Sequence, residues 1–360
     1  MEDLLNALWS TWNRIAGVQV PQAAVFHIPA QNCLPAGTAG NWIIAEKAYF
    51  TVRLNEMFLA ANRQWFVNFD PLVLVVTEFD YGAKRVAIPT VVGPELIPDP
   101  RQGGAPKYGS VIEDISVAGP YPYRGGDVVL SVRFYQVPTS NLVRSVLTTI
   151  GGLTQLASSL HELEPALGIA SAILSGVEGL LGLDATKSIS AYRGSLAPSV
   201  SRPFQAQAAA LVAPLAPSAA VDLWSVNGRL CLGADENRRY TASDFVLFSV
   251  EGAETRSDIG KLSFGRHRGA ALRAMTEGAE GTSRARASLL TAYAEMLDSP
   301  EMTTPDADRV FNAWLSEFEQ RKETIQRAAH LGPVTKADMR ASERATKIEK
   351  LDRAVRRLEA

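Results

Sequence analysis

The sequence predicts an α+β protein, and three observations carry that prediction. Short runs rich in aromatic and β-branched residues, separated by Gly and Pro, fill residues 20–140 and return in 184–260. Apolar residues recur at helical spacing in residues 270–360. A long apolar stretch, residues 141–183, separates the two β-rich regions. The expected fold is an antiparallel β-sandwich followed by a central helical hairpin, a small β element and a C-terminal helical region.

The domain organisation follows from these shifts in pattern. A chain of 360 residues is expected to hold about two to three domains. We divide it into an N-terminal amphipathic helix (1–16), an antiparallel β-sandwich domain (17–140), an apolar helical hairpin (141–183), a linker with a small β-sheet element (184–260), a helical region (261–334) and a charged amphipathic C-terminal helix (335–360).

The composition bounds the class of function. A hydrophobic fraction of 46% provides a sizeable core, and a net charge of −2 gives no reason to expect a nucleic-acid partner. Cys33 and Cys231 are too few for a disulfide framework, and both lie in apolar surroundings, so we expect two buried free thiols. The first residues lack the apolar core of a signal peptide, which favours a cytoplasmic protein.

The N-terminal segment 1–16 has the spacing of an amphipathic helix. Trp9 and Trp12 share its apolar face and are candidate interaction residues. Glu2 and Asp3 disfavour binding to an anionic membrane, because such helices are usually rich in Lys and Arg. Docking of this face on the chain's own core is the favoured interpretation.

The β-sandwich domain is predicted from a series of apolar and alternating runs. Residues 80–83 and 119–126 carry the turn-forming residues between some of them. Leu72–Phe79 is almost continuously apolar, which is typical of a strand buried on both faces. The expected strands are Ala23–Ile28, Trp42–Ile44, Tyr49–Leu59, Trp65–Phe69, Leu72–Phe79, Lys84–Val92, Tyr108–Val117 and Val128–Val137.

The central stretch 141–183 is predicted to be two helices that meet near Glu164-Pro165. Its second half has an aliphatic face and a face of Gly and Ser, which lets another backbone approach closely. A hairpin inside the core is favoured, and a membrane-active hairpin is the alternative. A standing transmembrane helix is disfavoured here, because the longest uncharged run within 141–183, Ser145 to Leu160, has sixteen residues where about twenty are needed.

Residues 184–260 are predicted to return to β structure. Residues 195–217, with four prolines and many alanines, are typical of a linker or a wrapping segment. Leu223–Val226 and Arg229–Leu232 flank Asn227-Gly228, the strongest hairpin signal in the chain. Together with Phe245–Val250, these strands are expected to extend the first sheet or to lie on the central helices.

The C-terminal regions are predicted to be helical. One helix covers about residues 283–298, and Thr304 caps another that has Pro305 at its first position and ends near Gly332. The last helix carries Ile348, Leu351, Val355 and Leu358 at heptad spacing, although Arg344 interrupts the seam. These four residues are candidate interaction residues for a protein partner or for self-association.

No pattern in the sequence predicts a catalytic, cofactor or metal site. His161-Glu-Leu-Glu164 lacks the third ligand that a zinc helix needs, and a solvated helix end is favoured. Arg266-His-Arg268 lies between glycines and could meet a phosphate, but an ordinary exposed turn is favoured. The glycine pairs form no phosphate loop or dinucleotide fingerprint. We therefore expect no cofactor and no metal.

These observations favour a non-enzymatic interaction protein, structural, adaptor or effector-partner, that acts through protein–protein contacts. One alternative is a membrane-acting effector whose hairpin 141–183 is released by a conformational change or by proteolysis. The other is an enzyme whose site is assembled only in three dimensions. The expected partner is a protein or a second copy of the chain, with no nucleic acid, and with a membrane only after release of 141–183.

Overall fold

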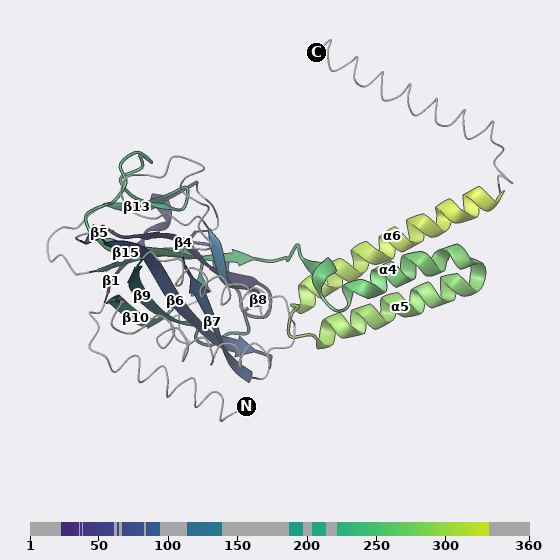
Figure 1. Ribbon diagram of the computed structural model, residues 1–360. Helices are drawn as coiled ribbons and strands as arrows, with labels where there is room; N and C mark the ends of the chain where they lie inside the picture. The colour runs from purple at the N-terminus through teal and green to yellow at the C-terminus, as the bar shows by residue number, and fades with distance from the viewer. Residues whose placement is uncertain are drawn as a thin grey trace, which may run out of the picture. The chain divides into compact units, whose positions relative to one another are not determined.

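The computed structural model describes residues 23–35, 37, 39–60, 63–64, 67–82, 84–93, 114–138, 187–196, 204–213 and 222–330. Within these ranges the fold is α+β, with antiparallel sheets in a sandwich and helices in the C-terminal half, which confirms the predicted class (Figure 1). The predicted segments 1–16, 141–183 and 335–360 lie outside the described residues.

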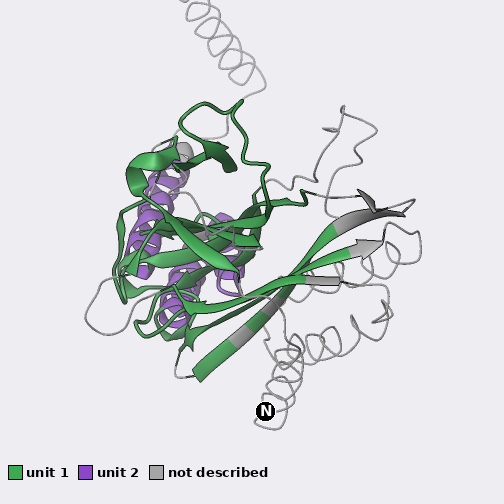
Figure 2. Ribbon diagram, turned by 90° about the vertical axis from the view of Figure 1, so that its left-hand side faces the viewer, with its two compact units in different colours: residues 1–259, 297–306 green, residues 260–296, 307–360 purple. Residues whose placement is uncertain are grey.

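The chain divides into two compact units, coloured separately in Figure 2. The β unit contains residues 1–259 and 297–306, and the helical unit contains residues 260–296 and 307–360. The chain therefore passes between the units three times, after residues 259, 296 and 306.

The first sheet of the β unit combines strands from both β-rich regions of the sequence. Its order is β1-β12-β15-β4-β8, and all four pairings are antiparallel. One predicted strand of the small β element, β15, and one strand from the predicted linker, β12, thus join the predicted sandwich. The bounds are β1 Ala24–Ile28, β12 Gln207–Ala213, β15 Asp244–Ala253, β4 Tyr49–Phe58 and β8 Ile115–Pro122.

The second sheet is built around one long strand, β6 (Val67–Tyr81). On one side β6 pairs with β9 (Val129–Pro138), which pairs in turn with β10 (Lys187–Ser195). Residues 73–81 of β6 also pair with β7 (Lys84–Val92), and its start pairs with β5 (Arg63–Gln64). β7 has the predicted bounds. Its pairing with β6 ends at Tyr81 and Lys84, so Asp80 and Tyr81 of the predicted turn at 80–83 belong to the strand.

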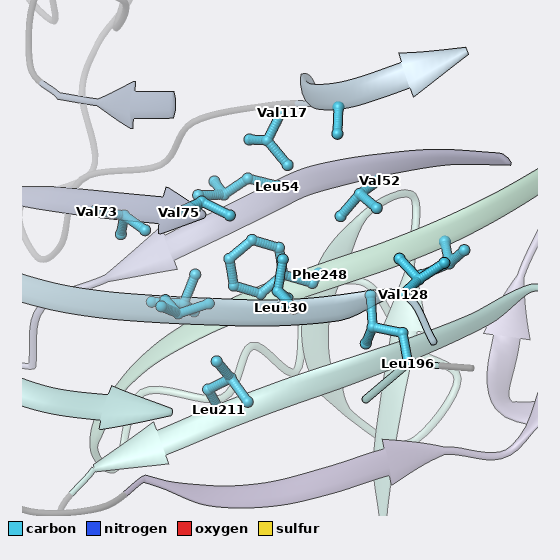
Figure 3. Packing of buried hydrophobic residues seen from close by; sticks show 14 of the residues in the cluster. Val52, Leu54, Val73, Val75, Val117, Val128, Leu130, Leu196, Leu211 and Phe248 are labelled. Carbon is cyan, nitrogen blue, oxygen red and sulfur yellow. The ribbon is translucent and has the colours of Figure 1, made fainter. Parts of the chain in front are cut away.

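The two sheets face each other across one hydrophobic core (Figure 3). Val52 and Leu54 from β4 and Phe248 from β15 meet Val75 from β6 and Leu130 from β9. Successive residues of a strand point to opposite faces, so this core uses every second residue. Leu72 and Leu74 on the other face of β6 are also buried, which explains its almost continuous apolar sequence.

Hydrogen bonds connect the edges of the two sheets. The Thr90 hydroxyl of β7 donates to the Val117 carbonyl of β8 at 2.8 Å, and the backbone N–H of Ala23, just before β1, donates to the Ala191 carbonyl of β10 at 3.0 Å. An open sheet edge is prone to pair with other chains, and these contacts cover parts of the edges instead.

A third layer covers part of the outer face of the first sheet. It consists of β13 (Leu223–Val226), β14 (Arg229–Leu232) and β2 (Cys33–Leu34), in the order β14-β13-β2, and β2 runs parallel to β13. The β13–β14 hairpin is confirmed with its predicted bounds. Asn227 and Gly228 both have positive φ, 51° and 75°, as a type I′ turn requires.

A bulge in β4 allows this strand to serve both cores. The β4–β15 register shifts between Leu247 and Phe248, next to Asn55. Before the bulge, Phe50, Val52 and Leu54 belong to the sandwich core, and after it Met57 does. Phe58 packs instead under the third layer. One extra residue therefore reverses which face of the strand each later side chain occupies.

The structure differs from the sequence-based strand assignments in three places. Residues 67–69 of the predicted strand Trp65–Phe69 and all of Leu72–Phe79 belong to the single strand β6. Pro71 does not interrupt it, because Pro71 pairs only with β9 and precedes the β7 pairing, so no ladder bond on the other side is lost. β8 extends through Gly119-Pro120, part of the predicted turn; as a sheet-edge strand it tolerates proline and shifted register.

The third difference concerns the segment expected to be a linker. Residues 207–213 form β12, an inner strand between β1 and β15, and residues 204–205 form β11, which pairs with β3 (Trp42–Ile43). Ala208 and Ala210 pack under the third layer. Small side chains at these positions allow that layer to lie close to the sheet, so the alanines reflect packing.

The helical unit contains α4 (Gly265–Ala274), most of α5 (Gly278–Asp298) and most of α6 (Thr304–His330), which lie side by side (Figure 1). Short 3-10 turns cover Ile259–Lys261 and Met275–Glu277. Leu289 of α5 and Phe318 of α6 pack with Ala271 of α4 in one apolar cluster. Helix α6 begins at the predicted Thr304, and α5 contains the predicted 283–298 helix.

Candidate interaction sites and a buried polar cluster

The candidate interaction residues from the sequence are not among those the structure places. Trp9, Trp12, Ile348, Leu351, Val355 and Leu358 all lie outside the described residues. Among the described residues, two large exposed apolar side chains, Trp42 and Ile44, lie in residues 39–48, which we call the strap.

The strap consists of the short strand β3 with a turn on each side, and backbone hydrogen bonds hold it at both ends. The N–H of Gly40 donates to the carbonyl of Ala206 at 2.7 Å, and the N–H of Ala206 donates to Asn41 at 2.9 Å. At the other end, the N–H of Glu46 donates to Tyr123 at 2.8 Å. The strap backbone is therefore fixed before any partner arrives.

Side chains alternate along the strap. Ile43 is only 1% exposed and belongs to the sandwich core, whereas Trp42 and Ile44 are 54% and 52% exposed. Gly252 of β15 makes room for Ile43, because a Cβ at this glycine would lie 2.7 Å from the Ile43 Cγ1. Burial of Ile43 thus orients two large apolar neighbours toward solvent, a pattern that sequence analysis missed because Ile43 and Ile44 are indistinguishable in the sequence.

A buried polar cluster lies elsewhere in the β unit and is centred on Arg256. Its guanidinium donates to both carboxylate oxygens of Asp258, at 2.7 and 2.9 Å, and to the side chain and backbone carbonyl of Glu301, at 2.9 and 2.7 Å. The side chain of Arg256 is 3% exposed. Burial alone lowers the pKa of Arg256, but the hydrogen bonds and negative charges of Asp258 and Glu301 outweigh it, so the pKa lies above its usual range.

Two tyrosines bring carboxylates of residues 297–306 onto the sandwich. The hydroxyl of Tyr49 donates to Asp306 at 2.9 Å and accepts from the N–H of Thr303 at 3.1 Å. The hydroxyl of Tyr81 donates to Glu301. Burial, together with the Asp306 charge and against the lowering effect of the Thr303 hydrogen bonds, raises the pKa of Tyr49 to about 12. Burial, then the Glu301 charge, also raises the pKa of Tyr81. Both hydroxyls therefore remain protonated donors.

The geometry of this cluster fits a structural role, in which it holds chain segments together, better than a catalytic one. Arg256 already donates to two carboxylates, and Tyr49 and Tyr81 each donate to one. Catalytic groups need access to a substrate, and the near-complete burial of Arg256 prevents it. Asp258 and Asp306 lie next to the points at which the chain leaves the β unit, and Glu301 lies in the segment 297–306 by which it returns, so the cluster holds these segments on the sandwich.

The two cysteines are free and buried, as predicted. Cys33 pairs with Ser225 of β13, and Cys231 pairs with Trp224 of the same strand from its other side. A whole strand thus separates the two cysteines, about 10 Å between backbones, which is too far for a disulfide. Burial raises the pKa of both thiols, which makes them poor nucleophiles at neutral pH.

The predicted exposed turn at Arg266-His-Arg268 is wrong, because these residues form the first turn of α4. His267 Nε2 lies 3.0 Å from a carboxylate oxygen of Glu295, and Arg268 makes two bonds of 2.9 and 3.1 Å to Glu317. Packing of α4 against α5 and α6 supplies these carboxylates. The cations therefore serve contacts within the helical unit, which weakens the case for a phosphate site.

Two further findings concern the alternative functions. Within the described ranges, no group of three or more His, Cys, Asp or Glu side chains is placed to hold a metal ion. Among the helices of those ranges, none combines the length and apolar content that a membrane crossing requires. His161 and Glu164 lie outside the described residues.

Comparison of the chain with protein-family models, with curated proteins and with solved structures finds no match.

Proposed function

We propose that the protein is a non-enzymatic interaction protein that binds a protein partner through Trp42 and Ile44 of the strap. The observation that supports this proposal is the exposure of these two large apolar side chains on a backbone that is already fixed. Tryptophan is enriched among residues that dominate binding energy, because it buries a large area with few rotatable bonds. A fixed backbone also lowers the ordering cost of binding.

The surroundings of the pair suit an interface as well. Asn41, Glu46 and Lys47 are exposed around it and supply a polar rim. Glu46 pairs with Arg124, whose guanidinium also donates to the Met302 carbonyl at 2.9 Å. The strap is thereby connected to residues 297–306, so its rim is held by side-chain contacts as well as by the backbone.

Site-directed photo-crosslinking tests this proposal in cells that naturally make the protein. A photoreactive residue replaces Asn41, next to the pair, and a matched control carries it at the exposed Asn237. We expect a discrete adduct with another protein from position 41 and none of that size from position 237. The adduct should disappear when Trp42→Ala or Ile44→Lys is added.

Stability measurements separate binding from folding. Trp42→Ala should leave the thermal unfolding temperature nearly unchanged, because half-exposed side chains contribute little to the core. An adduct at position 41 that survives both substitutions, or equal adducts from both positions, would contradict the proposal.

A further inference from the structure

Helix α5 has apolar residues on two opposite sides. Ala285, Leu289, Ala292 and Met296 are at most 3% exposed and face the interior. On the other side, Leu290 and Leu297 are 52% and 44% exposed. A helix on the surface of a protein normally presents polar residues at the centre of its solvent face, so a second apolar stripe calls for a second covering element.

The exposed stripe has the spacing of a coiled-coil seam. Its residues are separated by steps of four, three, four and three, and at 100° per residue they fall within an arc of about 80°. All of them are exposed. We call this set the α5 seam: Ser283, Ala287, Leu290, Ala294 and Leu297.

We propose that the α5 seam binds a second copy of this chain, with the two α5 helices antiparallel. In that arrangement Ala287 lies opposite Leu297 of the partner subunit, and Leu290 lies opposite Ala294 of the partner subunit. Each layer then combines one large and one small residue, which allows close packing without voids. A two-fold axis repeats the same layers on the other half of the seam.

The charges beside the seam favour the antiparallel direction. Arg284 and Asp298 flank the seam on the same side and lie two heptads apart. An antiparallel pair brings Arg284 next to Asp298 of the partner subunit, and the symmetric contact forms as well. A parallel pair gives neither charge an opposite partner. Arg284 contacts Glu277 in its own chain, but both side chains are more than half exposed, so exchange for Asp298 costs little.

The helix is already formed before association. The seam spans about two heptads, fewer than an isolated coiled coil needs. Helix α5, however, is held in the helical unit by Leu289 and its neighbours, so pairing does not carry the cost of forming the helix. A short seam can therefore suffice.

Analytical ultracentrifugation of the full chain over a series of concentrations tests the proposal. We expect a reversible dimer that Leu290→Glu weakens by about tenfold or more. Ile325→Glu, at an exposed apolar position of α6, is the matched control and should leave the dimer unchanged. A chain that stays monomeric, or a dimer that Leu290→Glu does not affect, overturns the proposal.

The direction of the helices has its own test. Arg284→Glu should weaken the dimer, and adding Asp298→Arg should restore it.

A mixture of Leu290→Cys and Ala294→Cys chains should form a disulfide between the two variants under mild oxidation. Leu290→Cys chains that link to one another instead would indicate a parallel pair and overturn the proposal. Trp42→Ala should leave the dimer intact, which separates this surface from the strap.

Discussion

At the scale of single residues, the buried polar cluster connects distant parts of the chain through a few hydroxyls and charges. Tyr49 meets Asp306 across 257 positions of sequence. Such a contact cannot be read from local pattern, because neither residue has an unusual neighbour in its own segment. The contribution of the Tyr49–Asp306 hydrogen bond to folding stability should depend on whether the Tyr49 hydroxyl carries its proton.

We predict that Tyr49→Phe makes stability less sensitive to alkaline pH. Because the pKa of Tyr49 is raised from 10.0 to about 12 in the folded chain, its contribution is complete below about pH 10 and is lost as the pH rises through 12. That contribution is on the order of 2–3 kcal/mol. Urea unfolding from pH 8 to 12 should therefore show a shallower decline for the variant.

Asp306→Asn is the companion to this experiment. It keeps the tyrosine but removes a charge that raises the Tyr49 pKa in the folded chain, so the decline should still begin near pH 10 but end at a lower pH and be smaller in total. Equal declines for Tyr49→Phe and the unmodified chain would show that folding does not change the pKa of Tyr49, and would contradict the prediction.

Gly252 provides a second test at this scale. We predict that Gly252→Ala destabilises the fold by about 1–3 kcal/mol, because its new Cβ overlaps Ile43. Gly260→Ala is the control, since a Cβ there meets nothing within 4 Å. Chemical denaturation of Gly252→Ala, Ile43→Ala and the double variant should give a double effect smaller than the sum. Strict additivity would contradict the proposed overlap.

At the scale of elements, one buried ion pair joins the third layer to the first sheet, beside their shared apolar cluster. Glu56 of β4 is 0% exposed, accepts the N–H of Leu230 in β14 at 2.7 Å and pairs with Arg239. The pair fixes the β13–β14 hairpin on the first sheet, at the bulge that turns Glu56 outward from the sandwich core. The Arg239 guanidinium is also partly removed from water, and this burial lowers its pKa.

We predict that Arg239→Met destabilises the protein by about 3–5 kcal/mol, because it leaves the Glu56 carboxylate buried without its cation. Adding Glu56→Gln should recover part of the loss, since the uncompensated charge is gone. Urea titrations of the three variants measure both effects. A double variant less stable than Arg239→Met alone would show that Glu56 contributes through Leu230 rather than through the ion pair.

Elements differ in how far local sequence predicts them. The β13–β14 hairpin has its predicted bounds because Asn227 and Gly228 adopt the positive φ angles that few other residues tolerate. Local sequence does not predict a strand at residues 207–213, because alanine has no strong preference for strands. These residues become a strand through their pairing with β1 on one side and β15 on the other.

At the scale of the whole molecule, the C-terminal tail offers a test of the interaction function. From residue 336 to 360 the sequence has eight basic and five acidic residues, and Gly332-Pro333 precedes it. We predict that truncation after residue 332 leaves thermal stability nearly unchanged but weakens self-association or partner binding. Differential scanning calorimetry and ultracentrifugation measure the two outcomes. A drop of several degrees would show that Ile348, Leu351 and Val355 pack on the body of the protein.

The sequence by itself determined the α+β class, the β6–β7 turn, the β13–β14 hairpin and the start of α6 at Thr304. These features depend on periodicity, turn residues and helix caps, which act over a few neighbouring positions. Only the tertiary structure decided that β15 lies between β12 and β4, that Tyr49 meets Asp306 and that Trp42 rather than Ile43 faces solvent. Those outcomes depend on contacts between segments far apart in the chain, whose free energy no single segment encodes.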